Sequence, residues 1–120
     1  MIVSFTDIGG IVDHLFIFVY FADLPIVSTD QPVYYPERGT DTILACSAKN
    51  ATAVFWQRLF PSQRRVSINS EPAYPKYSGG TISNPSLTVH QVTNYDDGEY
   101  LCFGQNSFAT KSASTKIISK

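Results

Sequence analysis

One short segment near the C-terminus constrains this chain more than any other feature. Residues 96–102 read Asp-Asp-Gly-Glu-Tyr-Leu-Cys, and the only other cysteine, Cys46, lies far upstream. The single tryptophan, Trp56, lies between the two cysteines. Alternation of apolar and polar residues is typical of a strand with one buried face. The segment therefore predicts a strand that points Tyr100 and Cys102 into a core.

The composition fits one domain made of strands. The chain has 120 residues, of which 43% are hydrophobic and 16% charged, as suits a single globular core. Its seven Tyr and eight Phe favour strands, and its seven Pro and seven Gly favour turns. A net charge of −1 gives no electrostatic reason to bind nucleic acid or an anionic membrane surface. We expect an all-β domain that could be attached to a membrane only through flanking segments outside this chain.

The two cysteines stand 56 positions apart, at 46 and 102. A zinc site needs about four clustered ligands, so this pair indicates one disulfide bond instead of a metal site. A disulfide implies an oxidising compartment and therefore a secreted or cell-surface protein. Two buried free thiols are the alternative.

The first 25 residues differ in character from the rest. Residues 15–22 are an apolar run, and the segment carries Asp7 and Asp13 but no Lys or Arg. A secretory signal peptide has a basic start, and a membrane-spanning helix needs about 20 apolar residues. We expect residues 1–25 to be a leader outside the domain. It is a poor signal peptide, an extra strand or helix, or translated intron.

Turn signals every eight to twelve residues divide the remainder into short strands. A central strand carries Val54 and Trp56 inward, and the last one carries Ala113, Thr115 and Ile117 inward. Arg64 and Arg65 are expected at a solvated hairpin tip. The expected strands cover residues 31–35, 41–47, 53–59, 66–69, 77–83, 86–89, 99–104 and 111–118.

The set of motifs resembles the immunoglobulin superfamily over residues 26–118. The residues that carry the resemblance are Cys46, Trp56, Leu87-Thr88-Val89 and Asp96-x-Gly98-x-Tyr100-x-Cys102. The cysteine spacing resembles the intermediate (I-set) type, whereas Pro-Lys-Tyr-Ser-Gly-Gly at residues 75–80 resembles variable-type domains. The Gly-x-Pro usual after the first cysteine of I-set domains is missing, and Lys-Asn-Ala-Thr stands at residues 49–52. The resemblance implies an immunoglobulin-like two-sheet Greek-key sandwich.

The resemblance also implies structural roles for the motif residues. Cys46 and Cys102 would bridge the two sheets over Trp56. The Tyr100 hydroxyl would bond to the backbone between Thr93 and Asp96, and Gly98 would adopt a conformation or packing that a side chain blocks. The implied core residues are Trp56, Leu87 and Tyr100, and the implied ion pair is Lys76 with Asp96.

The residues left over by these roles are the candidates for function. If Trp56, Tyr100 and Cys102 point inward, their neighbours Phe55, Leu101 and Phe103 point outward and form one apolar patch, which often marks a protein-binding surface. Flanking side chains or residues 1–24 covering the patch are the alternative. Phe108, at the tip of the loop formed by residues 105–110, is a second binding candidate. Asn50-Ala51-Thr52 is an N-glycosylation sequon, whereas proline excludes Asn84-Pro85-Ser86.

Catalysis is not expected from this sequence. The two histidines are His14, in the leader, and His90, at a strand end where a surface role is expected. The sequence has no nucleophile elbow, phosphate-binding glycine loop or metal-ligand cluster. We therefore expect no enzyme, no cofactor and no metal.

The expected function is that of a non-catalytic module in a cell-surface or secreted adhesion or recognition protein. Such a module binds another protein, or a second copy of itself, through its front sheet or loops. One alternative is a structural spacer in a tandem array. Another is an immune recognition domain for carbohydrate or microbial surfaces, which would gather polar and aromatic loop residues at one end of the sandwich.

Overall fold

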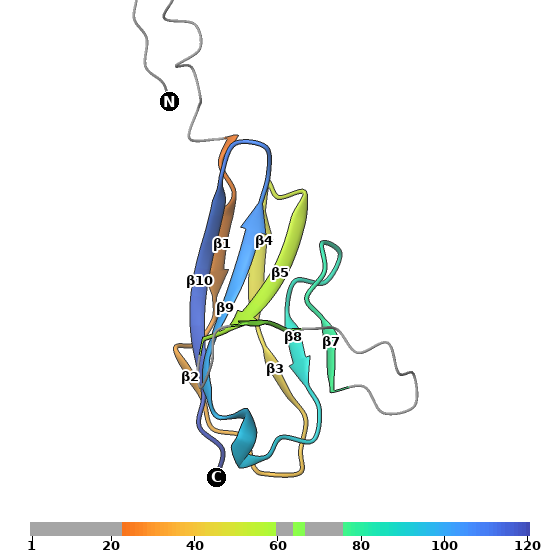
Figure 1. Ribbon diagram of the computed structural model, residues 1–120, viewed down its shortest axis with the longest axis vertical. Coiled ribbons are helices and arrows are strands. Elements are labelled where there is room, and N and C mark those ends of the chain that lie inside the picture. The colour runs from red at the N-terminus through yellow and green to blue at the C-terminus, as the bar shows by residue number, and fades with distance from the viewer. Residues whose placement is uncertain (1–22, 60–63, 67–75) are drawn as a thin grey trace, which may run out of the picture.

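Strands make up almost all of the regular structure in the part of the chain that the structure describes. The computed structural model describes residues 23–59, 64–66 and 76–120 (Figure 1). The all-β prediction is confirmed, and the described residues also include a short 3-10 helix, η3 (Asn94–Asp96). The strands are β1 (Ile26–Thr29), β2 (Val33–Tyr34), β3 (Thr42–Leu44), β4 (Cys46–Lys49), β5 (Ala53–Arg58), β6 (Arg64–Arg65), β7 (Tyr77–Gly79), β8 (Leu87–Val89), β9 (Gly98–Gln105) and β10 (Thr110–Ile117).

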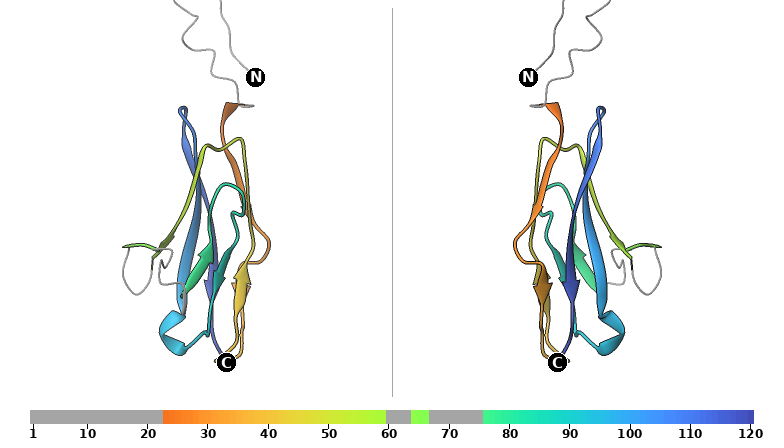
Figure 2. Two further views of the ribbon diagram at one scale, coloured as in Figure 1. Left: turned by 90° about the vertical axis from the view of Figure 1, so that its right-hand side faces the viewer. Right: turned by 90° about the vertical axis from the view of Figure 1, so that its left-hand side faces the viewer.

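The strands form two layers, as in a β-sandwich. A five-stranded sheet has the order β2-β10-β9-β5-β6, in which β10 pairs antiparallel with β9 and parallel with β2. The other layer contains the three-stranded sheet β3-β8-β7 and the pair β1-β4. Only Ala45 separates β3 from β4, so these two groups follow one another along the same face (Figure 2).

The break at Ala45 corrects the expectation of one strand over residues 41–47. The Ala45 backbone N–H donates to the Tyr34 hydroxyl at 3.1 Å, and the Cys46 N–H donates to Ser86 Oγ at 3.0 Å. Side chains therefore take the place of a neighbouring backbone at this point, and the ladder is interrupted. Upstream of the break β3 pairs with β8, and downstream of it β4 pairs with β1.

Three further boundaries differ from the sequence prediction. β1 was not predicted, although its Ile-Val-Ser-Thr sequence pairs along its full length with β4. Arg64 and Arg65 are not a hairpin tip: they form β6 and pair with β5. The strand expected over residues 77–83 ends at Gly79, because Gly79 and Gly80 have φ values of 79° and 68° that leave the extended region. Of the strand expected over 66–69, only Val66 lies within the described residues.

The core lies between the layers and is crossed by the predicted disulfide, which is confirmed. Cys46 in β4 and Cys102 in β9 are bonded, with 6.6 Å between their Cα atoms. Trp56 is 2% exposed, and its indole N–H donates to the Pro85 carbonyl at 2.8 Å. The buried apolar residues are Leu44, Cys46, Trp56, Val66, Leu87, Val89, Val92, Tyr100, Cys102 and Ile117.

Tyr100 fastens the turn before β9 to the core. Its side chain is fully buried, and its hydroxyl donates to the Asp96 carbonyl at 2.6 Å. Gly98, between these residues, has a φ of 144°, which a residue with a side chain rarely adopts. Burial raises the pKa of the Tyr100 hydroxyl well above its ordinary value, because the phenolate would lose its hydration.

This raised pKa predicts a loss of stability in alkali. Above the pKa of tyrosine in an unfolded chain, about 10, the unfolded state releases a proton that the folded state keeps. The free energy of unfolding then falls by about 1.4 kcal/mol per pH unit, whereas below pH 10 the group contributes no slope. Urea denaturation of the wild type and of Tyr100→Phe between pH 8 and pH 11 measures the effect.

The Tyr100→Phe variant should lose this alkaline slope, because phenylalanine does not titrate. Tyr95→Phe is the matched control, since the Tyr95 side chain is 82% exposed. An alkaline slope that survives Tyr100→Phe but disappears in Tyr95→Phe would contradict the role assigned to Tyr100.

Candidate functional site

The outward face of the five-stranded sheet carries the predicted binding residues. Because Tyr100 and Cys102 are buried, the residues that alternate with them on β9 point away from the core. The register continues this face across β10 and β5. We use the name front face for its three uncharged cross-strand rows, which are Thr110–Gln105–Ala53, Ser112–Phe103–Phe55 and Ser114–Leu101–Gln57. The next outward row, Lys116–Glu99, is charged and borders the front face.

An aromatic pair occupies the centre of the front face. Phe55 and Phe103 are cross-strand partners, and their rings stack with centroids 4.8 Å apart and planes 7° apart. Leu101 lies two residues from Phe103 on the same side of β9. All three side chains are half-buried instead of fully exposed. The structure thus brings the three predicted residues together, and a stacked pair of this kind stabilises by about 0.5–1.5 kcal/mol beyond its buried area.

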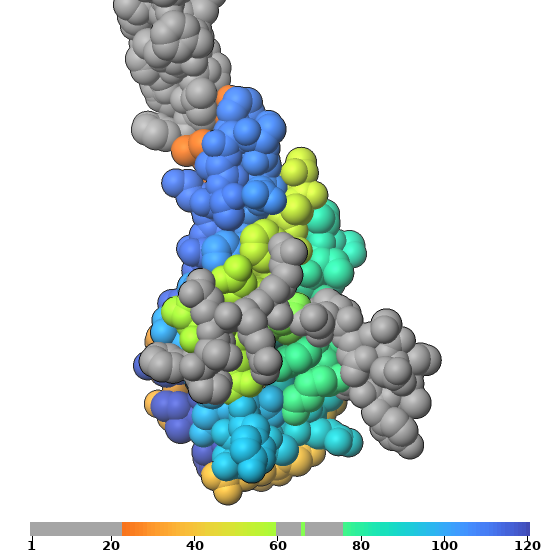
Figure 3. Space-filling model, in the orientation of Figure 1, coloured from red at the N-terminus to blue at the C-terminus, as the bar shows by residue number. Residues whose placement is uncertain are grey.

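Within the three rows, the residues that border this pair are uncharged, and those on β10 are short. No residue of the nine in the three rows carries a charge. On β10 the neighbours of Phe103 and Leu101 are Ser112 and Ser114, which are short and exposed. Figure 3 shows the surfaces of β9 and β10, in blue, on the face turned to the viewer. An apolar centre with a neutral polar border resembles the make-up of protein contact surfaces.

Phe108 lies apart from the front face, at the end of the domain. Its ring is 56% exposed in the loop between β9 and β10. There it lines a hollow of about 270 Å³ together with Asn50, the predicted glycosylation residue. The two binding candidates therefore belong to two separate surfaces.

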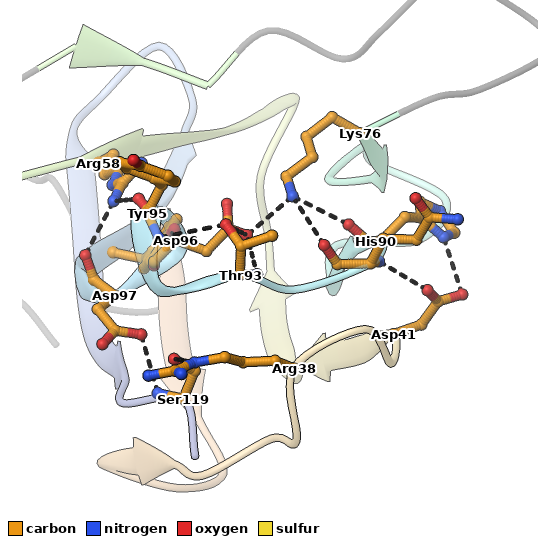
Figure 4. Close-up of polar contacts among 12 residues, drawn as sticks. Arg38, Asp41, Arg58, Lys76, His90, Thr93, Tyr95, Asp96, Asp97 and Ser119 are labelled. Carbon is orange, nitrogen blue, oxygen red and sulfur yellow. Dashed lines mark hydrogen bonds and ion pairs between the residues drawn. The ribbon is translucent and has the colours of Figure 1, made fainter.

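A polar cluster holds the opposite end of the domain together (Figure 4). Lys76 Nζ lies 2.8 Å from Asp96 Oδ2, and the same oxygen accepts the Thr93 backbone N–H at 2.8 Å. The Asp96 side chain is 4% exposed, whereas that of Lys76 is 35% exposed. Lys76 also donates to the carbonyls of His90 and Gln91. The pair therefore fixes η3, on which the Tyr100 hydroxyl bond depends.

Arg58 is a buried charge that sequence reasoning missed. Its side chain donates to the Tyr95 carbonyl and, at 2.8 Å, to the Asp97 carbonyl, and its guanidinium lies 5.5 Å from the centre of the Tyr100 ring. The alternation that places Trp56 inward also places Arg58 inward, so the pattern contained the signal. Arg58 braces the turn around η3 and is committed to structure.

Ser78, His90 and Asp41 form a chain of contacts on the outer side of the other layer. His90 Nε2 lies 2.9 Å from Ser78 Oγ, and His90 Nδ1 lies 3.0 Å from Asp41 Oδ2. The Gln91 backbone N–H donates to Asp41 and, with the His90 contact, holds the pKa of that carboxyl below its ordinary value. A serine, a histidine and an aspartate in this order can activate the serine hydroxyl as a nucleophile. Acyl transfer also needs hydrogen-bond donors that stabilise the oxyanion of the substrate. The contacts join β7, the residue after β8 and the residue before β3, so they brace these three segments against one another.

The described part of the chain holds no cluster of three or more His, Cys, Asp or Glu that could bind a metal. In the same residues, no helix is long and apolar enough to cross a membrane. No model of a protein family matches this sequence, and neither does any curated protein. The chain is a small all-β domain with a disulfide between its layers, an arrangement consistent with an immunoglobulin-like fold.

Proposed function

We propose that this chain is an immunoglobulin-like, non-catalytic module of an extracellular or cell-surface protein, and that it binds protein through the front face. The sheet order supports an immunoglobulin-like fold. The sheet β2-β10-β9-β5-β6 packs opposite β1-β4 and β3-β8-β7, and immunoglobulin domains divide their successive strands between two sheets in the same way. The disulfide supports the compartment, since such bonds persist where the surroundings are oxidising.

The observation that carries the proposal is the stacked pair Phe55–Phe103 at the centre of nine neutral residues. Aromatic side chains are enriched and charged side chains depleted at the centres of protein interfaces. The backbone of the front face is already paired in the sheet, so side chains must supply the contact. The mechanism is complementarity of shape and polarity on a face that the disulfide holds rigid.

A second copy of the domain is the partner that this face fits. In a two-fold symmetric contact residue i meets residue j and j meets i, so a charge near the symmetry axis lies close to its own copy. The centre of the front face avoids this penalty because its three rows are uncharged, and its apolar centre would meet an apolar centre. The charged residues Arg65, Glu99 and Lys116 lie at its border. A contact made by one sheet face is small, so the dissociation constant should lie in the range of about 1 μM to 1 mM.

Self-association should weaken at least about tenfold in Phe103→Glu. The substitution places one carboxylate from each copy in the centre of the contact. A tenfold change corresponds to about 1.4 kcal/mol, and burying an unpaired charge costs more than that. Sedimentation equilibrium gives both dissociation constants. Ile43→Glu is the matched control, because Ile43 is 58% exposed on β3 in the other layer.

Urea denaturation must first show that both variants fold, because Phe103 is half-buried. Two results contradict the proposal: a wild type that stays monomeric at about 1 mM, or a Phe103→Glu variant that associates as strongly as Ile43→Glu.

A structural spacer is the second candidate, and one observation favours it. β1 starts at one end of the domain and the C-terminus lies at the other, so the described chain passes along the long axis (Figure 1). Such an arrangement suits a domain that separates its neighbours. In a spacer, neither Phe103→Glu nor Ile43→Glu changes any association, which separates the two candidates.

A further inference from the structure

The end of the domain away from the polar cluster carries a hollow that the front-face proposal leaves unused. It lies where the loop between β4 and β5 meets the loop between β9 and β10. Its volume is about 270 Å³. The residues around it are Asp23, Asn50, Ala51, Thr52, Asn106, Ser107 and Phe108.

The complete sequon Asn50-Ala51-Thr52 forms part of this rim. Asn50 is exposed and has a φ of 61°, in the left-handed region that asparagine tolerates better than most residues. Its Nδ2 donates one hydrogen to the Leu24 carbonyl at 3.3 Å, a bond that the single N–H of a glycosylated amide can also make. Thr52 is anchored to β9, because both its backbone N–H and its hydroxyl donate to the Gln105 carbonyl, at 2.8 Å and 3.2 Å. The acceptor residue thus lies on a surface turn whose other end is fixed to the sheet.

Asn106 joins this turn to the loop that carries Phe108. Its side-chain amide donates to the Asn50 carbonyl at 2.8 Å and to the Asp23 carbonyl at 2.7 Å. Its side-chain oxygen accepts the Phe108 backbone N–H at 2.8 Å. One asparagine therefore holds the acceptor and an exposed aromatic ring on the same hollow.

We propose that Asn50 carries an N-linked glycan and that the first sugar of this glycan lies in the hollow against Phe108. An N-acetylglucosamine ring has a face of C–H groups, and packing it on the Phe108 ring removes apolar area from water. Its hydroxyl and acetamido groups face the polar side chains of the rim. The hollow can hold a single sugar ring, and the rest of the glycan extends into solvent.

The modification is a group transfer from a lipid-linked pyrophosphate oligosaccharide. A bond forms between Asn50 Nδ2 and the anomeric carbon of the first sugar. The bond from that carbon to the pyrophosphate oxygen breaks, and the lipid pyrophosphate leaves with the electron pair. One amide proton passes to a base of the transferase, and no group is oxidised or reduced. The acceptor must pass through a secretory compartment, as the disulfide also requires.

Expression of the chain in the secretory pathway of a eukaryotic cell tests the attachment. The intact mass should exceed that of the polypeptide, and peptide N-glycosidase should remove the excess. Asn50→Gln and Thr52→Ala should each abolish it, whereas Asn84→Gln, in the proline-blocked Asn-Pro-Ser segment, should keep it. An unmodified secreted wild type, or a glycan that persists in Asn50→Gln, overturns the proposal.

The contact with Phe108 needs a second readout. The glycosylated wild type should melt a few degrees above Asn50→Gln, because the sugar stabilises only the folded loops. In the Phe108→Ala background this difference should vanish while the glycan stays attached. A difference of the same size in both backgrounds overturns the packing of the sugar on Phe108. Phe103→Glu does not enter this test, so it stands or falls independently of the front-face proposal.

Discussion

Replacing Cys46 and Cys102 together by alanine is expected to lower the free energy of unfolding by about 4 kcal/mol. The bond closes a loop with a sequence separation of 56 residues and connects the two layers of the domain. Without it the unfolded chain gains the conformational freedom that the cross-link removed. Stabilities of natural domains are about 5–15 kcal/mol, so the loss would leave this one marginal. Urea denaturation of the wild type and the double variant measures it.

Reductant provides the control for this prediction. Wild type in excess dithiothreitol should lose about as much stability as the double variant, whereas the variant itself should not respond. Thiol labelling of the unreduced, denatured wild type should find no free cysteine. A loss below about 1 kcal/mol would show that the cross-link does not limit the unfolded state as the chain-entropy account requires.

Trp56→Ala should cost about 3–5 kcal/mol. The indole is 2% exposed, lies opposite Cys102 in the register and donates to the Pro85 carbonyl. Alanine leaves a cavity between the layers and an acceptor without its donor. Chemical denaturation followed by circular dichroism measures the change, because the substitution removes the tryptophan fluorescence.

A neighbouring substitution controls for effects on β5 itself. Gln57→Ala changes the same strand on the front face and should cost less than about 1 kcal/mol. Trp56→Phe should fall between the two, since it keeps the aromatic bulk and loses the hydrogen bond. Equal losses in Trp56→Ala and Gln57→Ala would mean that Trp56 does not fill the core.

The long strands were predictable because alternation is strongest where both neighbours are paired. In β9 and β10 the pattern correctly separated buried Tyr100, Cys102, Thr115 and Ile117 from outward Leu101 and Phe103. The sequence could also indicate which residues face outward on β5. It could not indicate that the front face is neutral across three strands, because that depends on the register between β5, β9 and β10.

The features that the sequence did not reveal depend on contacts between distant segments. The interruption at Ala45 arises from the Tyr34 hydroxyl and from Ser86, and no local pattern encodes these partners. Arg58 was unexpected in the core because an arginine ordinarily remains in water. It is buried here because the turn around η3 offers it two carbonyls and an aromatic face.

The two surfaces proposed for function lie on different parts of the domain. The front face occupies the side of the five-stranded sheet, and the Asn50 hollow lies at the end near β1. A glycan on Asn50 would therefore shield the end of the domain and leave the front face accessible. Neither surface depends on the geometry of the other, so each can be tested alone.

The central claim is that the front face is the contact surface of the domain. The most direct test is a series of amide NMR spectra of the wild type between about 10 μM and about 1 mM. We expect the amides of Leu101, Phe103, Ser112 and Ser114 to shift progressively with concentration, while those of Ile43 and Thr88 in the other layer stay in place. Shifts confined to the β3-β8-β7 sheet, or no shift over this range, would contradict the claim.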